Sequence, residues 1–209
     1  MNQITNHHIF YHTSVIQPRF SYHPRIPQQA QCVFSGVRSE VYQWDQEMYD
    51  GSYTTFELLR FLDGAFTIAI TDEGKILITE QEQPAKDHPF LGLPGGSFDF
   101  PDEGALACAQ RELLEETGYE SHDWTLWHTF DGTGNVATFT HFYIARNALP
   151  VQDIRSDPGE KIRLFSLDFE EFLALSSDVR FHHHWSLIPL LYEARINTEK
   201  KEELRKLLF

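Results

Sequence analysis

Three glutamates dominate the chemistry that this sequence could perform. Glu112, Glu115 and Glu116 follow Arg111 in a segment whose pattern predicts a helix over residues 104–117. At about 100° per residue, the three carboxylates fall within an arc of roughly 100° on one helix face. Like charges at this spacing repel one another, so we expect a compensating cation.

A hard divalent cation suits that role best. Mg²⁺ takes oxygen ligands and is usually shared between a few carboxylates and the phosphates of a substrate. Arg111 is adjacent in sequence, but its direction on the helix predicts that it reaches only one flank of the acidic face. The spacing therefore indicates a Mg²⁺-dependent site for a phosphate compound.

The alternative is a solvated acidic face, which an isolated E-x-x-E-E pattern more commonly marks. Three neighbouring features favour a site: the Gly95-Gly96 pair before the helix, Gly118 at its end, and the arginine before the first glutamate. Glycine allows a close backbone approach before the helix and the left-handed conformation that ends it.

The overall charge limits the classes of molecule that this protein can bind. Seventeen Lys and Arg residues stand against 31 Asp and Glu residues, a net charge of −14, so nucleic-acid backbones and anionic membranes should be repelled. Two cysteines, Cys32 and Cys108, exclude a disulfide framework, and no stretch reaches the roughly 18 apolar residues of a membrane helix. The N-terminus has neither a basic start nor an apolar run, so we expect a cytoplasmic protein with no nucleic-acid or membrane partner.

The elements around the helix alternate between strand and helix patterns. The length of 209 residues suits an extended arm at residues 1–30 and one domain at residues 31–209. A hairpin is expected at residues 64–80, and residues 94–96 should break the chain. The remaining patterns predict strands at 33–37, 39–44, 54–59, 124–130, 137–145 and 161–167, and helices at 169–175 and 185–207 with a break near Asn197. This order favours an α/β fold with a mixed sheet packed between helices.

The segment over residues 95–119 resembles the Nudix box, G-x5-E-x7-R-E-U-x-E-E-x-G-U, in which U is an aliphatic or aromatic residue. From Glu103 onward the match has no gap. The glycine of the box falls on Ser97 by strict counting, one residue after Gly96, which indicates a one-residue insertion in the loop before the helix. The wider resemblance covers roughly residues 34–195.

The resemblance implies an α/β/α sandwich preceded by N-terminal strands. It also implies an enzyme that hydrolyses the pyrophosphate of a nucleoside diphosphate linked to another group, with bound Mg²⁺ or Mn²⁺. The roles carried over from the box are metal ligation by Glu112, Glu115, Glu116 and the Gly96 carbonyl, orientation of the glutamates by Arg111, and support of the loop–helix junction by Glu103.

The flanking segments resemble the ADP-ribose and nucleotide-sugar pyrophosphatases. The loop at residues 157–160 resembles their late acidic loop, which makes Glu160 a candidate for activating water or binding a further metal; the alternative is an ordinary loop residue. Where that subclass often has an arginine, this chain has Gln83, two residues after Gln81. The subclass also implies a homodimer paired through the N-terminal regions.

Two alternatives to this function stay open. One is a hydrolase of nucleoside triphosphates or dinucleoside polyphosphates, and the other is a non-catalytic Nudix-fold module that senses its ligand. Such binding modules tend to lose the paired glutamates, which this chain keeps as Glu115 and Glu116. Substrate profiling separates these classes.

Overall fold

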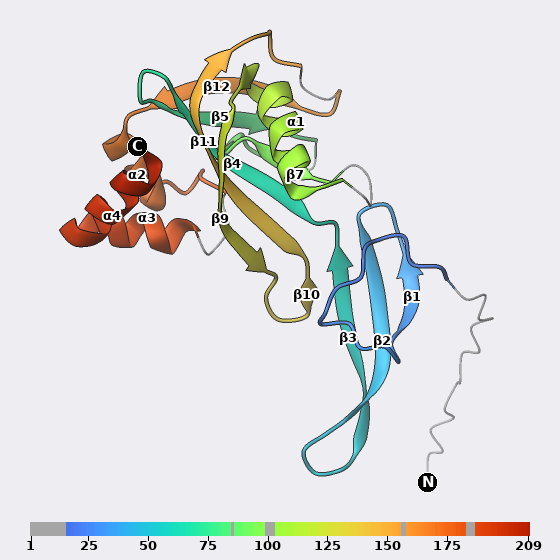
Figure 1. Cartoon of the computed structure of the whole chain (residues 1–209). Helices are drawn as coiled ribbons and strands as arrows, with labels where there is room; N and C mark the ends of the chain where they lie inside the picture. Colours follow the sequence, from blue (N-terminus) through green and yellow to red (C-terminus); the bar gives the residue numbers. More distant parts are fainter. Residues whose placement is uncertain (1–15, 85, 99–102, 156–157, 183–186) are drawn as a thin grey trace. The chain divides into compact units, whose positions relative to one another are not determined.

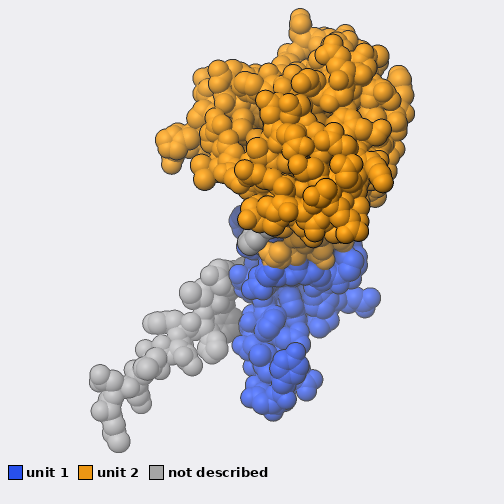
Figure 2. All heavy atoms as spheres, turned by 90° about the vertical axis from the view of Figure 1, so that its left-hand side faces the viewer, with its two compact units in different colours: residues 1–61, 134–137 blue, residues 62–133, 138–209 orange. Residues whose placement is uncertain are grey.

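The computed structural model describes residues 16–84, 86–98, 103–155, 158–182 and 187–209. The chain divides into two compact units (Figure 2). The first contains the described residues up to Phe61 together with Gly134–Ala137, and the second contains Leu62–Thr133 and Thr138–Phe209. Residues 16–30 of the expected arm belong to the first unit, and residues 1–15 lie outside the described residues.

A four-stranded sheet forms the first unit. Its order is β1-β2-β3-β10, with bounds Gln31–Ser35, Ser39–Glu47, Tyr53–Phe61 and Val136–Ala137. The buried carboxylate of Glu40 accepts hydrogen bonds from the hydroxyls of Ser35 (3.0 Å) and Tyr42 (2.9 Å). Arg60, opposite Glu40 in register, donates to the Ser21 carbonyl (3.2 Å). These bonds satisfy charges that would otherwise be costly to bury, and they fasten residues before β1 to the sheet.

An eight-stranded sheet forms the centre of the second unit (Figure 1). Five strands follow the order β12-β5-β4-β11-β8, while β6 pairs with β5, β7 with β4 and β9 with β11. The bounds are Gly64–Thr71 (β4), Ile76–Glu82 (β5), Phe90–Gly92 (β6), Gly95–Ser97 (β7), Tyr119–Glu120 (β8), Asp123–Asp131 (β9), Phe139–Pro150 (β11) and Lys161–Leu167 (β12). Strands β4 and β11 run parallel and the other pairs antiparallel, so the sheet is mixed, as predicted.

Helices cover both faces of this sheet (Figure 1). On one face, α1 (Ala105–Thr117) packs Leu113 against Ala69 and Leu77. The other face is covered by α2 (Phe169–Ala174), the short 3₁₀ helix η1 (Leu175–Ser177), α3 (Leu187–Ile196) and α4 (Thr198–Leu208). These pack on Ile68 and Ile78, because successive side chains of a strand point to opposite faces. The predicted α/β/α sandwich is confirmed, and no helix in the described ranges is long and apolar enough to cross a membrane.

Two segments beside α1 differ from the predicted pattern. Strands β4 and β5 are consecutive, but the pair Ile70–Ile76 is their only ladder contact within the described residues. Beyond it, β7 pairs with β4 and β6 with β5. The predicted break at residues 94–96 is wrong, because β7 begins at Gly95. A Cβ on Gly95 would lie 2.3 Å from the Ala65 carbonyl oxygen, so glycine allows this close pairing.

Helix α1 ends at Gly118, as the sequence predicts. Gly118 adopts a left-handed φ of 75°, and its N–H donates to the Leu114 carbonyl (2.9 Å). The Gly118 carbonyl accepts hydrogen bonds from the N–H groups of Val151 (2.8 Å) and Gln152 (3.2 Å). A Cβ at this position would lie 2.1 Å from the Gln152 carbonyl oxygen, so both conformation and packing require glycine.

We expect Gly118→Ala to lower the free energy of unfolding by more than about 2 kcal/mol, because left-handed strain of about 1–2 kcal/mol adds to the clash. Gly74→Ala is the matched control. Gly74 has the same φ of 75°, but among the described residues its Cβ would meet only Phe209, at 3.8 Å, so the strain acts alone. Urea unfolding of both variants measures the difference, and equal losses would contradict the role of the clash.

Candidate active site

Arg111 connects three of the predicted site carboxylates. Its guanidinium donates to Glu103 (2.9 Å), Glu112 (2.9 Å) and Glu115 (3.2 Å). It also donates to the Ser97 carbonyl (3.3 Å). These contacts agree with the prediction that Arg111 reaches the acidic face from one flank, because they join Glu112 and Glu115, while the Glu116 carboxylate accepts hydrogen bonds from Gln81 and Gly95. Arg111 thus holds Glu112 and Glu115 in one arrangement and offsets part of their charge.

Glu116 faces the sheet and is 4% exposed. Its Oε1 accepts a hydrogen bond from Gln81 Nε2 (2.8 Å), and its Oε2 accepts one from the Gly95 N–H (2.9 Å). Burial raises the pKa of Glu116 well above its ordinary value; the charges of Glu112 and Glu160 raise it further, and the two hydrogen bonds oppose the rise. A cation beside this carboxylate would relieve both the burial cost and the repulsion.

The two glycines of β7 bring backbone close to the glutamates. A Cβ on Gly96 would lie 2.3 Å from Glu112 Oε1, so this carboxylate rests directly against the strand. The Gly96 carbonyl is turned toward β4, because its oxygen would lie 2.6 Å from a Cβ on Gly64, and the Cys108 thiol donates to it at 3.6 Å. The N–H of Gly95, by contrast, is presented to the glutamate side.

Glu160 reaches the same group of carboxylates from the loop before β12. The antiparallel register of β5 and β12 places Gln83 opposite Glu160, one step beyond the ladder. Gln83 Nε2 donates to Glu160 Oε1 (2.9 Å) and to Gln81 Oε1 (3.2 Å). Two glutamine amides therefore connect Glu160 to Glu116.

The predicted site residues form two linked groups. Arg111 gathers one group, which consists of Glu103, Glu112 and Glu115, and the glutamine pair joins Glu116 to Glu160. In the described residues, no three acidic, His or Cys side chains stand close enough to hold a metal ion as they are arranged. The donor chemistry still fits a hard cation, since Glu112, Glu116 and Glu160 supply carboxylate oxygens whose charges already interact.

Three hydrogen-bond donors of the site are absent from the predicted set, namely the side chains of Gln81 and Gln83 and the N–H of Gly95. One feature of β5 could have indicated the role of the glutamines. Gln81 is a buried polar residue on the same face of the strand as Leu77. Such a residue requires a partner. The partner depends on which helix covers that face, and this is not a local property of the sequence.

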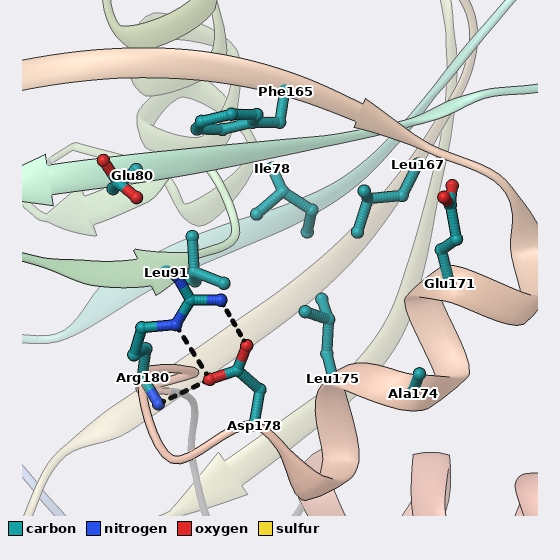
Figure 3. Close-up of a pocket in the computed structure, with 10 residues that line it drawn as sticks. All are labelled: Ile78, Glu80, Leu91, Phe165, Leu167, Glu171, Ala174, Leu175, Asp178 and Arg180. Carbon is teal, nitrogen blue, oxygen red and sulfur yellow. Dashed lines mark hydrogen bonds and ion pairs between the residues drawn. The ribbon is translucent and has the colours of Figure 1, made fainter.

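A separate hollow of about 420 Å³ lies on the opposite face of the sheet (Figure 3). It is lined by Ile78 and Leu91 from the strands and by residues of α2 and η1. Arg180 donates to both carboxylate oxygens of Asp178 at its edge (3.1 and 2.7 Å). None of the predicted site residues lines this hollow, so it does not coincide with the candidate active site.

We expect Gly96→Ala to weaken the binding of Mn²⁺, a paramagnetic substitute for Mg²⁺, about 10- to 100-fold. The added methyl would displace the Glu112 carboxylate, whereas the strand can stay in place. Electron paramagnetic resonance measures free Mn²⁺ during a titration. Gly104→Ala is the matched control, since a Cβ there meets no atom of the described residues within 4 Å. Unchanged affinity in Gly96→Ala would show that Glu112 is not a ligand.

Comparison with known proteins places this geometry in a family. The model of the NUDIX domain matches residues 61–189. An ADP-ribose pyrophosphatase of Bacillus subtilis (strain 168) is 27% identical over 145 residues, which cover 68% of this chain and 78% of the relative. A methanol dehydrogenase activator of Bacillus methanolicus is 27% identical over 162 residues, which cover 77% of this chain and 87% of that protein.

The three-dimensional fold is also similar to that of a solved hydrolase. A crystal structure of an ADP compounds hydrolase superimposes with a TM-score of 0.65 at 18% sequence identity, covering 87% of this chain and 92% of that one. The NUDIX match spans more than half of the chain and includes α1 with all of its glutamates. The chain belongs to the Nudix family of pyrophosphohydrolases.

Proposed function

We propose that this protein hydrolyses the pyrophosphate bond of ADP-ribose in a Mg²⁺-dependent reaction that releases AMP and ribose 5-phosphate. The burial of Glu116 beside Glu112 and Glu160 carries this proposal. Carboxylates held together with a residual negative charge suit a divalent cation that is shared with substrate phosphates. The similarity to the Bacillus subtilis ADP-ribose pyrophosphatase supports this substrate class.

The side chains divide the work in the following way. Bound Mg²⁺ supplies polarisation of the phosphoryl oxygens and a lower pKa of the attacking water. Glu112 and Glu116 would hold the cation, with Glu115 beside them on the more exposed side of the helix. Glu160 accepts a proton from the attacking water. The water oxygen bonds to phosphorus as the bridging P–O bond breaks. Glu103 supports this arrangement by fixing Arg111.

One backbone carbonyl also belongs to the proposed ligand set. The predicted carbonyl of Gly96 faces β4, so its neighbour suits the role better. In an antiparallel strand the N–H and C=O of one residue point to the same side. Because the Gly95 N–H meets Glu116, the Gly95 carbonyl is the backbone oxygen that faces the glutamates.

The sequence predicts a cytoplasmic protein and the resemblance implies a homodimer, and both features stay predictions. The first unit exposes Phe34, Tyr49 and Tyr53, side chains that pairing through the N-terminal regions would cover.

We expect Glu116→Gln to reduce Mg²⁺-dependent cleavage of ADP-ribose by at least about 100-fold, because loss of a ligand exceeds the 10- to 100-fold effect of losing a ligand's partner. Mass spectrometry of the products measures this. Glu202→Gln, an exposed change on α4, should retain full activity.

The same measurement separates the alternatives when the substrates include nucleotide sugars, dinucleoside polyphosphates and nucleoside triphosphates. Release of a monophosphate and pyrophosphate from triphosphates alone would replace ADP-ribose with that substrate class. Tight binding of ADP-ribose without cleavage would indicate the sensor.

We expect Mg²⁺ to raise the melting temperature of the wild-type protein but not that of Glu116→Gln. A cation that binds only the folded state at 100 times its dissociation constant stabilises by about 2.7 kcal/mol. Differential scanning fluorimetry with a chelator control measures the shift. An equal shift in both proteins would place the cation elsewhere.

A further inference from the structure

Gln81 lies on β5, and Gln83 directly follows the end of this strand at Glu82. Gln81 and Gln83 are two residues apart, so their side chains leave the strand on the same side, which is the side of α1. Gln81 is buried, and Gln83 is partly buried at the end of the strand.

The hydrogens of both amide groups are fully used. Gln83 Nε2 donates one hydrogen to Glu160 Oε1 (2.9 Å) and one to Gln81 Oε1 (3.2 Å). Gln81 Nε2 donates one to Glu116 Oε1 (2.8 Å) and one to the Thr79 hydroxyl (3.2 Å). An amide NH₂ has two hydrogens, so neither group has a donor to spare.

The direction of this chain of hydrogen bonds is fixed at both ends. In the cation-bound site both Glu116 and Glu160 would be ionised and could only accept, so a reversed amide would turn its oxygen toward a carboxylate. Thr79 adds a third constraint, because its hydroxyl donates to the Gly92 carbonyl (3.2 Å) and so accepts from Gln81. One arrangement of the two glutamines therefore satisfies every partner.

We propose that Gln83 is a positioning residue that orients Glu160 relative to Glu116 through the amide of Gln81. The proposal rests on the proposed function, in which Glu160 takes the proton of the attacking water. Amides suit this task because they direct both carboxylates without neutralising either, which leaves their charge for the cation.

The effect of such a residue should appear in the reaction more than in stability. One partly exposed hydrogen bond contributes little to folding, whereas a misplacement of about 1 Å in an active site can cost about 100-fold in rate. Loss of Gln83 should therefore change kcat and metal affinity and leave the folded state intact.

We expect Gln83→Met, which keeps the side-chain length and removes both donors, to lower kcat about 10- to 100-fold with KM little changed. In a Glu160→Gln background the same change should cause no further loss, because the residue through which Gln83 acts is already inactive. Additive losses would overturn the proposal. Gln83→Leu, also uncharged and without donors, serves if Gln83→Met does not fold.

Mn²⁺ affinity provides a readout that is independent of turnover. We expect Gln83→Met and Glu160→Gln each to weaken Mn²⁺ binding, and the double variant to match Glu160→Gln. Gln43→Met is the matched control, since Gln43 Nε2 donates to Glu57 Oε2 (2.7 Å) across β2 and β3 in the same chemical arrangement. This control should bind Mn²⁺ and turn over like the wild type.

The two proposals fail in different ways. If the wild type binds Mn²⁺ and cleaves no pyrophosphate, the proposed function fails, and the Mn²⁺ affinities alone decide the role of Gln83. If the wild type cleaves ADP-ribose and Gln83→Met equals it in kcat and Mn²⁺ affinity, the positioning role fails and the function stands. A wild type without Mn²⁺ binding would overturn both.

Discussion

The burial of the Glu116 carboxylate is the constraint on which the rest of the site depends. A carboxylate at 4% exposure is stable only if its oxygens are hydrogen-bonded. Gly95 and Gln81 each donate a hydrogen bond to one oxygen, and this requirement explains a glycine strand that lies close to α1 and a buried amide on the face of β5 that also carries Leu77. Both features follow from the placement of one charge.

The compensating positive charge is distributed unevenly across the acidic face. Arg111 binds Glu103, Glu112 and Glu115, while Glu116 receives its hydrogen bonds from neutral donors. A guanidinium is permanently charged, so its contacts reduce the attraction of those carboxylates for any further cation. On the side toward Glu116 and Glu160, burial raises the pKa of Glu116 and repulsion between carboxylates raises it further, and both effects favour a cation there.

Local features of the sequence predict the helix and its end well. The period of the apolar residues and Gly118 define α1, because both act within a few residues of the chain. The angle of Arg111 on the helix predicts the flank that it approaches, but not which of the carboxylates there it binds, since the Cα–Cβ direction does not fix the end of a long side chain. Strand β7 and the glutamine pair depend on which strands lie beside α1, and this order comes from contacts between distant segments.

The resemblance to the Nudix box selects the carboxylates, and the strand register explains how Glu160 joins them. Glu160 lies opposite Gln83 because β5 and β12 pair in one register, and a shift of β12 by one residue would turn Glu160 to the other face of the sheet. An arginine at position 83 could also bind Glu160. It would, however, bring a fixed positive charge to Glu116 and Glu160, which receive hydrogen bonds from neutral donors. Glutamine keeps the two carboxylates aligned and leaves their negative charge in place, so geometry and electrostatics at this site are set by different residues.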